Sequence, residues 1–255
     1  MHTRDEVLQV LTSGFIDNAD VYALWQGGSS AFDRSDEWSD IDLMLITSDG
    51  YEKQAMQQAE TLLESNFGID MKFEIDPPQW PGMTQTFFRL KNASPFLLVD
   101  FSILPLSAPD KFSAPEIHGN PIVLFDKQSI IHDVQPMSYE NLKRKLKARI
   151  AIQKHKQEIF RVLVDKEINR SNAIDAFIFY WSYTLAPLVE KLRIKHATYH
   201  WNFGSRYLNK HLPADIAAEL EQLYFVRNLE DLKQKNVKAR AWLNIAFDEA
   251  LQSLQ

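Results

Sequence analysis

The chain has 255 residues, and 45% of them are hydrophobic while 24% are charged, a balance typical of a folded protein. It contains no cysteine, which excludes disulfides, thiolate metal sites and a cysteine nucleophile. No apolar run approaches the ~20 residues needed to span a bilayer, and the first ten residues lack the apolar core of a signal peptide. We therefore expect a cytoplasmic protein without a membrane partner.

Charge is distributed unevenly along the chain. Residues 1–137 contain 8 Lys and Arg against 21 Asp and Glu, whereas residues 138–255 contain 20 against 13. The first part therefore has a net charge of -13 and the second +7. An acidic part joined to a basic part suits a site where carboxylates hold a metal and cations meet phosphate. Long surface helices that simply carry many Lys and Arg explain most of the positive charge equally well.

The first part of the chain alternates between helical and strand patterns. Residues 4–17 and 52–67 repeat apolar side chains at helical spacing, and Gly68 fits a helix end. Short apolar or alternating runs predict strands at 21–26, 41–47, 69–75, 84–90, 95–104 and 120–126. The turn at 91–94 predicts an antiparallel hairpin, and a Pro-rich loop occupies 76–83. This order predicts an α+β fold with a mixed sheet flanked by helices.

From Ser138 onward strand patterns vanish and helical patterns replace them. The predicted helices cover 138–165, 172–193, a segment opening at Leu212-Pro213, and 229–253. Ser138 and Ser171 are the expected N-caps of the first two, and Pro187 predicts a kink or an early end in the second. We therefore divide the chain near residue 137, with a helical bundle as its second domain.

The most informative stretch joins a turn of small residues to two acids on a strand. Ten residues separate Ser29 from Asp40. Side chains at i and i+2 of a strand point the same way, so Asp40 and Asp42 project together while Ile41 faces the core. Two adjacent carboxylates repel each other, and a divalent cation removes that penalty. Hard oxygen ligands favour magnesium.

Further residues around this pair fit a nucleotide. Gly28 lets the backbone approach a phosphate closely, and Ser29 offers a hydroxyl and an N–H to its oxygens. Ser39 is a third candidate for nucleotide binding, although it could serve only to bond backbone in a turn. Asp100 interrupts the apolar strand 95–104, where a lone buried charge is costly unless it is paired. A metal held jointly with the two earlier acids would pair it.

These residues resemble the signature of the DNA polymerase β-type nucleotidyltransferase superfamily. Gly28 and Ser29 match its turn, Asp40 and Asp42 its paired metal ligands, and Asp100 its third carboxylate. Within the superfamily, the length and the helical second part are similar to the bacterial nucleotidyltransferases that act on aminoglycosides and lincosamides. The resemblance is sharp over residues 27–43 and around Asp100.

The resemblance implies magnesium-dependent transfer of a nucleoside monophosphate, typically AMP from ATP, to a hydroxyl of a small molecule such as an aminoglycoside-like antibiotic. Residues 1–137 would form the nucleotidyltransferase catalytic domain, and 138–255 a helical substrate-binding domain. One or two magnesium ions would be held by the three aspartates. A homodimer stays open, because some related enzymes build their site across two subunits.

The proton acceptor is left undecided by the sequence. Asp100 is one candidate, and some related enzymes draw the base from the helical domain. There the candidates are Glu190 and Asp175 on the helix predicted at 172–193, with His196 and His200 as alternatives.

Two other readings remain. In the first, the acceptor is a protein or an RNA end, although pI ≈ 5.7 without interleaved arginines and aromatics makes nucleic acid an unlikely partner. In the second, the chain is a non-catalytic binding module of the same fold. Phosphate loops of the Walker and Rossmann kinds are absent from the sequence.

Overall fold

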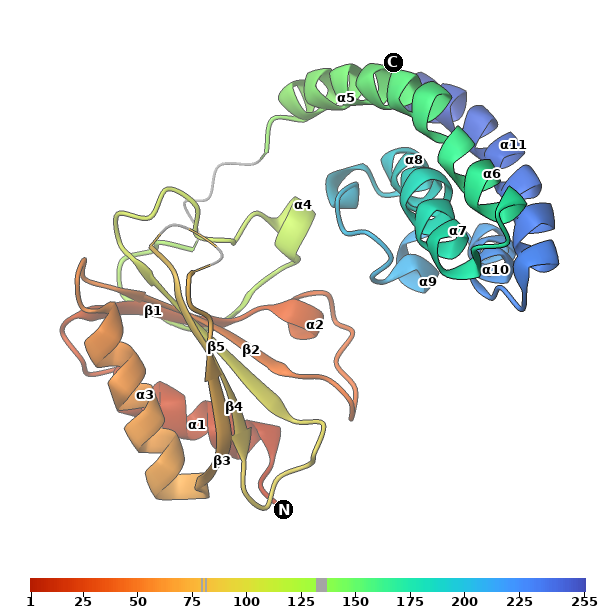
Figure 1. The fold of residues 1–255 in the computed structure, drawn as a ribbon. Helices are drawn as coiled ribbons and strands as arrows, with labels where there is room; N and C mark the ends of the chain where they lie inside the picture. Colours follow the sequence, from red (N-terminus) through yellow and green to blue (C-terminus); the bar gives the residue numbers. More distant parts are fainter. Residues whose placement is uncertain (79, 81, 132–136) are drawn as a thin grey trace. The chain divides into compact units, whose positions relative to one another are not determined.

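A computed structural model describes residues 1–78, 80, 82–131 and 137–255 (Figure 1). The chain divides into two compact units, Met1–Met137 and Ser138–Gln255. The first contains a sheet with helices, and the second is helical. Over the part of the chain that is described, none of the helices combines the length and apolar character that crossing a membrane requires.

Among the described residues, six strands form one sheet with the order β3-β4-β5-β2-β1-β6. The strands are β1 (Val21–Gln26), β2 (Ile41–Thr47), β3 (Ile69–Glu74), β4 (Thr84–Leu90), β5 (Leu98–Pro105) and β6 (Ile122–Asp126). β2 and β5 run parallel, whereas the other neighbouring pairs run antiparallel. The predicted α+β class with a mixed sheet is confirmed, and so is the hairpin between β4 and β5.

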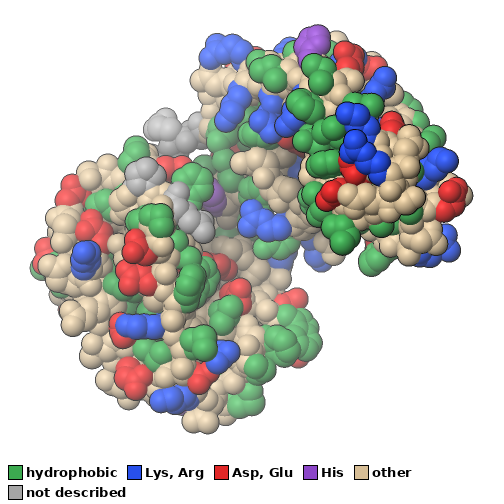
Figure 2. Space-filling model, viewed as in Figure 1, with side chains coloured by type: hydrophobic (Ala, Val, Ile, Leu, Met, Phe, Trp, Pro, Cys, Tyr) green, Lys and Arg blue, Asp and Glu red, His purple; other side chains and the backbone are tan. Residues whose placement is uncertain are grey.

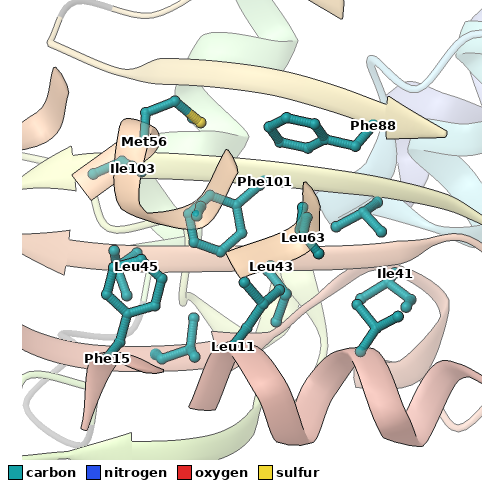
Figure 3. Packing of buried hydrophobic residues seen from close by; sticks show 14 of the residues in the cluster. Leu11, Phe15, Ile41, Leu43, Leu45, Met56, Leu63, Phe88, Phe101 and Ile103 are labelled. Carbon is teal, nitrogen blue, oxygen red and sulfur yellow. The ribbon is translucent and has the colours of Figure 1, made fainter. Parts of the chain in front are cut away.

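Two helices, α1 (Arg4–Phe15) and α3 (Glu52–Phe67), pack on one face of this sheet. Figure 3 shows Leu11 and Phe15 of α1 meeting Leu43 of β2 and Phe101 of β5. Burying each such side chain contributes roughly 1.5–3 kcal/mol. Because strand side chains alternate, the residues between these buried ones point to the opposite face.

Part of that opposite face is covered by a second, smaller core. Loops around the short helix α4 (Pro115–His118) and the end of β6 supply its outer side. Its buried members are Ala23, Trp25, Ile46, Met83, Leu104, Ala108 and Ile131. Met83 comes from the Pro-rich loop, of which Gln79 and Pro81 lie outside the described residues. Asp42 and Asp100, nearer the starts of their strands, are only half-buried.

The second unit is built from helices alone in its described residues. They are α5 (Tyr139–Phe160), α6 (Val162–Asn169), α7 (Ala173–Tyr180), a π-helical turn (Trp181–Leu185), α8 (Ala186–His196), a 3₁₀ turn (Thr198–His200), α9 (Leu208–His211), α10 (Ala214–Tyr224) and α11 (Leu229–Ser253). The bounds predicted for the last helix are confirmed. On the face drawn in Figure 2, Lys and Arg side chains are numerous over this unit.

The predicted helix 138–165 is divided in two. Ser138 caps it as expected, since its Oγ accepts from the N–H of Asn141 at 3.4 Å. The helix then ends at Phe160, and α6 begins after Arg161. Arg161 is the C-cap of α5 and the N-cap of α6, and its carbonyl also accepts a hydrogen bond from Arg240 of α11.

The predicted helix 172–193 begins and continues differently from expectation. Ser171 has φ of 59° and lies outside the helix, so the expected cap is wrong, and Asn172 occupies the N-cap position. The π-helical turn at Trp181–Leu185 comes just before Pro187, which lies in the first turn of α8. A proline lacks the N–H and crowds the preceding turn, and a π-helical turn relieves both problems. Pro187 was predicted to kink or end the helix, and the α-helical pattern is interrupted by this π-helical turn before it resumes as α8.

Candidate active site

Asp42 of β2 and Asp100 of β5 are direct neighbours across the sheet. The two residues are register partners on parallel strands. The residues that follow them, Leu43 and Phe101, are buried beneath α1 and α3. Alternation therefore sends both carboxylates to the opposite, more open face of the sheet.

Asp40 lies immediately before β2 and is half-buried. Its charge acts on both Asp42 and Asp100, so the three predicted acids share one electrostatic neighbourhood. Within the described ranges, however, no group of three or more His, Cys, Asp or Glu side chains is arranged to hold a metal ion. The metal-binding role of the three aspartates therefore stays a prediction.

Burial and mutual repulsion make both strand carboxyls unusually ready to hold a proton. Burial is the largest cause of a raised pKa at Asp42, the charge of Asp40 adds to it, and Arg4 opposes it. Burial also raises the pKa of Asp100 to about 6, with a further contribution from Asp42. A carboxyl that titrates so close to neutral pH is suited to exchanging protons.

Gln85 of β4 orients the Asp100 carboxylate. Its Nε2 donates to the two carboxylate oxygens at 2.8 and 3.0 Å, and Ser102 Oγ lies 3.4 Å from one of them. These hydrogen bonds lower the pKa of Asp100 and so offset part of the effect of burial. Gln85 was not predicted as a site residue, because the local pattern of β4, in which it lies two residues before Phe87, does not show that it reaches Asp100.

The turn of small residues packs directly against Asp42. Gly28–Ala31 forms one helical turn, α2, and the N–H of Gly27 donates to the Asp42 carbonyl at 2.9 Å. Gly28 has φ of +57°, and a Cβ placed on it would lie 1.7 Å from Asp42 Oδ2. Only a glycine fits so close to this carboxylate in that conformation. The residues predicted to hold phosphate and those predicted to hold metal are thus in contact.

A Gly28→Ala variant is therefore expected to displace the Asp42 carboxylate and lower the free energy of unfolding by about 1–2 kcal/mol from the backbone conformation alone. Urea denaturation measures the stability. Gly27→Ala is the matched control, because a Cβ there meets nothing within 4 Å and its φ is -105°. Equal stability losses in the two variants would contradict the assigned contact.

Arg4, the first residue of α1, joins three parts of this site. Its guanidinium donates to Ser30 Oγ at 2.8 Å and to the Ser39 carbonyl at 3.1 Å. With its amide turned, the Gln26 oxygen accepts from the same group at 2.7 Å. Burial lowers the pKa of Arg4, whereas the charges of Asp42 and then Asp40 raise it. Arg4 thus holds the turn in place and offsets part of the repulsion between the acids.

The sequence reading did not identify Arg4 as a site residue. The available signal is the capping box formed by Thr3 and Glu6, which fixes the helix start at Arg4. The capping box fixes Arg4 as the first residue of the helix, but it does not show which groups the Arg4 side chain contacts.

The two predicted nucleotide-binding serines differ in their surroundings. Ser29 is half-exposed in the turn, and its Oγ lies 3.5 Å from Ser35 Oγ. Ser39 Oγ donates to Asp36 Oδ1 at 2.7 Å and accepts from the Asp36 N–H at 3.0 Å. Ser39 therefore fixes the loop before Asp40, and nucleotide binding by either serine stays a prediction.

Glu190, a candidate proton acceptor on α8, is held in an ion-pair network within the helical unit. Arg149 donates two hydrogen bonds to its carboxylate at 3.0 and 2.9 Å, and the buried Lys191 lies 2.9 Å from Oε1. Burial by itself raises the pKa of Glu190, but the Arg149 hydrogen bonds and the Lys191 charge outweigh it, so the pKa is lowered. Such a stabilised carboxylate is a weak base, which favours a structural role.

The remaining base candidates also have specific surroundings. Asp175 accepts from Asn172 Nδ2 at 2.6 Å in the first turn of α7. Burial lowers the pKa of His196. His200 stacks on His211 with ring centroids 4.5 Å apart. None of these contacts singles out a proton acceptor, and the assignment stays a prediction.

No known family model matches the chain, and no curated protein matches it by sequence. Among solved structures, it is similar to an aminoglycoside 6-adenyltransferase from Bacillus subtilis, with a TM-score of 0.38 and 12% identity. That match covers 100% of this chain and 92% of the other. At this level of likeness, the function has to be argued from the residues of the chain itself.

Proposed function

We propose that the unit Met1–Met137 catalyses magnesium-dependent transfer of a nucleoside monophosphate, typically AMP from ATP, to a hydroxyl of a small molecule. The observation that carries the proposal is the in-register pair of Asp42 and Asp100 on one face of neighbouring strands, with Gly28 packed against the first of them. Paired carboxylates beside a glycine turn are suited to a cation and a phosphate chain at once.

The residues present fit a magnesium ion by their chemistry. Asp42 and Asp100, with Asp40 beside them, offer the hard oxygen ligands that magnesium prefers. The burial and repulsion that raise the pKa values of the strand pair are penalties that a nearby cation would relieve. When bound, magnesium would neutralise charge on the phosphates and favour departure of pyrophosphate.

The chain's own residues have separate tasks in this proposal. Gly28 gives the phosphates close access to backbone, and Arg4 keeps that turn fixed against the start of β2. In this proposal Asp100 accepts the proton of the acceptor hydroxyl, because it lies beside Asp42 on the strand pair, whereas the Glu190 carboxylate is engaged by Arg149 and Lys191. Gln85 holds the Asp100 carboxylate in one orientation for that step.

The helical unit, Ser138–Gln255, has the role of substrate-binding domain in this proposal. A cationic acceptor, such as an aminoglycoside-like molecule, is favoured by the net charge of -13 over residues 1–137. A negatively charged surface raises the local concentration of a cation.

The test uses the full chain with magnesium, each common nucleoside triphosphate and a panel of aminoglycosides and lincosamides. The proposal expects pyrophosphate release that requires both magnesium and one acceptor, together with an acceptor heavier by one nucleoside monophosphate in mass spectrometry. Chelation of the metal should abolish both signals.

Other outcomes would overturn the small-molecule acceptor. Labelling of a protein or RNA in lysate by radioactive ATP, without any small-molecule product, would replace it with a macromolecular acceptor. Absence of magnesium-dependent triphosphate binding, with a stable second chain co-purifying, would indicate a non-catalytic module.

A further inference from the structure

Two aromatic side chains lie together on the surface at the loops that lead into β2 and β5. Trp38 is 58% exposed and Phe96 is 53% exposed. Their ring centroids are 4.8 Å apart with an interplanar angle of 77°, an edge-to-face pair. Aromatic rings in contact usually bury most of their area, yet over half of each remains open to solvent here.

Local hydrogen bonds fix the backbone that carries both rings. The N–H of Trp38 donates to Asp36 Oδ1 at 3.1 Å, within the loop that Ser39 also fixes. The N–H of Phe96 donates to Ser94 Oγ at 3.3 Å, and the next N–H, of Leu97, donates to the Ser94 carbonyl at 3.0 Å. The ordered backbone and the contact between the rings limit the freedom of the pair, which reduces the entropy that binding costs.

The pair lies at the same edge of the sheet as the candidate active site. Trp38 precedes Asp40 by two residues, and Phe96 precedes Asp100 by four. β2 and β5 are parallel neighbours, so both rings lie off the strand ends at which these acids are found. β1 runs antiparallel to β2, which brings the turn at Gly28 to this edge as well.

We propose that the Trp38–Phe96 pair is the stacking site for the base of the nucleoside triphosphate. This inference rests on the proposed function and adds to it the group that recognises the base. The surroundings of the pair are acidic and do not attract the anionic triphosphate. Stacking of the base on an aromatic ring would supply affinity that charge does not. A ring face is common to all bases, so the pair should favour a base over none without selecting one strongly.

The test compares two probes in the presence of magnesium: ATP, and tripolyphosphate, which has the phosphates but no base. Dissociation constants are measured by calorimetry for the unmodified protein and for Trp38→Leu, Phe96→Leu and Trp38→Phe. We expect Trp38→Leu to weaken ATP binding on the order of tenfold and to leave tripolyphosphate binding unchanged. Trp38→Phe keeps a ring and should bind ATP within about threefold of the unmodified protein.

Fluorescence gives a second readout. ATP should quench tryptophan emission in the unmodified protein, and that change should be lost in Trp38→Phe even though binding is kept. An equal loss of affinity for ATP and for tripolyphosphate would show that the substitution disturbs the loop, and it would overturn the proposal. Unchanged ATP affinity in Trp38→Leu, or weakened affinity for the acceptor alone, would overturn it too.

The two proposals fail in different ways. If the unmodified protein binds neither ATP nor tripolyphosphate with magnesium, the proposed function falls and this inference with it. If ATP binds and nucleotide transfer proceeds while the leucine variants bind ATP normally, only the stacking site is wrong.

Discussion

An Asp42→Asn protein is expected to lose acceptor-dependent pyrophosphate release by on the order of a thousandfold. The amide has nearly the same shape as the carboxylate, so the packing against Gly28 is retained while one negative charge disappears. That charge is half of the in-register pair proposed to hold the cation. Arg4, which this carboxylate partly balances, would then repel a cation at the site.

Pyrophosphate release at saturating magnesium and triphosphate measures the loss. Asp70→Asn is the matched control, because it removes the same charge from an exposed residue of the edge strand β3, where Asp70 pairs with the exposed Arg89. Surface ion pairs of this kind contribute about 0–1 kcal/mol, and the control should keep its activity. An Asp42→Asn protein with more than a tenth of the original rate would place the chemistry elsewhere.

The features that sequence predicted well are those set by local periodicity. Alternation in a strand is a property of consecutive residues, so Ile41 and Asp42 could be assigned to opposite faces without knowledge of the partner strand, whereas Asp40 lies just before β2 and its direction stays a prediction. The same applies to Asp100 within an apolar run. A long amphipathic segment fixed the bounds of α11 equally well, because capping and periodicity agree there.

Contacts between residues far apart in the chain do not follow from local periodicity. Arg4 reaches a carbonyl 35 positions away, and Gln85 reaches Asp100 across 15. The pairing of Arg149 with Glu190 spans 41 positions and changes a candidate base into an ion-pair member. Nothing in local spacing specifies which long side chain meets which carboxylate, because tertiary packing decides it.

Helix ends were also misjudged where two short-range rules compete. Ser171 is a good N-cap by type, but its positive φ places it in the turn that ends α6, and the next residue caps instead. At Arg161, the cap shared by α5 and α6, the carbonyl also accepts from Arg240, a contact that local periodicity does not encode. At Ser171 the turn conformation overrides the residue's preference for the N-cap position.

Replacing Asp100 with Asn should have opposite effects on stability and on activity. Its pKa is raised from 3.8 to about 6 in the folded protein, largely by burial. The folded protein therefore binds this proton more tightly than the unfolded chain does. The carboxyl contributes stability below pH about 4, and that contribution is lost as pH rises through about 6. At neutral pH the ionised group opposes folding by up to about 3 kcal/mol.

An Asp100→Asn protein should consequently unfold at higher urea concentration than the original protein above pH about 6 when magnesium is absent. The difference in free energy of unfolding should grow between pH about 4 and 6 and then level off. Subtracting one protein from the other removes the titration of distant groups, so the remaining pH dependence belongs to Asp100 together with Asp42 and Asp40, whose charges act on it. A difference that does not vary with pH would show that burial of this carboxyl is not the cause.

Adding magnesium and triphosphate tests whether the destabilising Asp100 carboxylate serves to bind a cation. A cation that binds the original protein and not the variant stabilises only the former, so the stability gap should narrow as magnesium is added. The variant should also release no pyrophosphate with any acceptor. If removal of this carboxyl strengthens the fold, that result supports the proposed role of Asp100 in the reaction, because folding alone gives no reason to place a charge there.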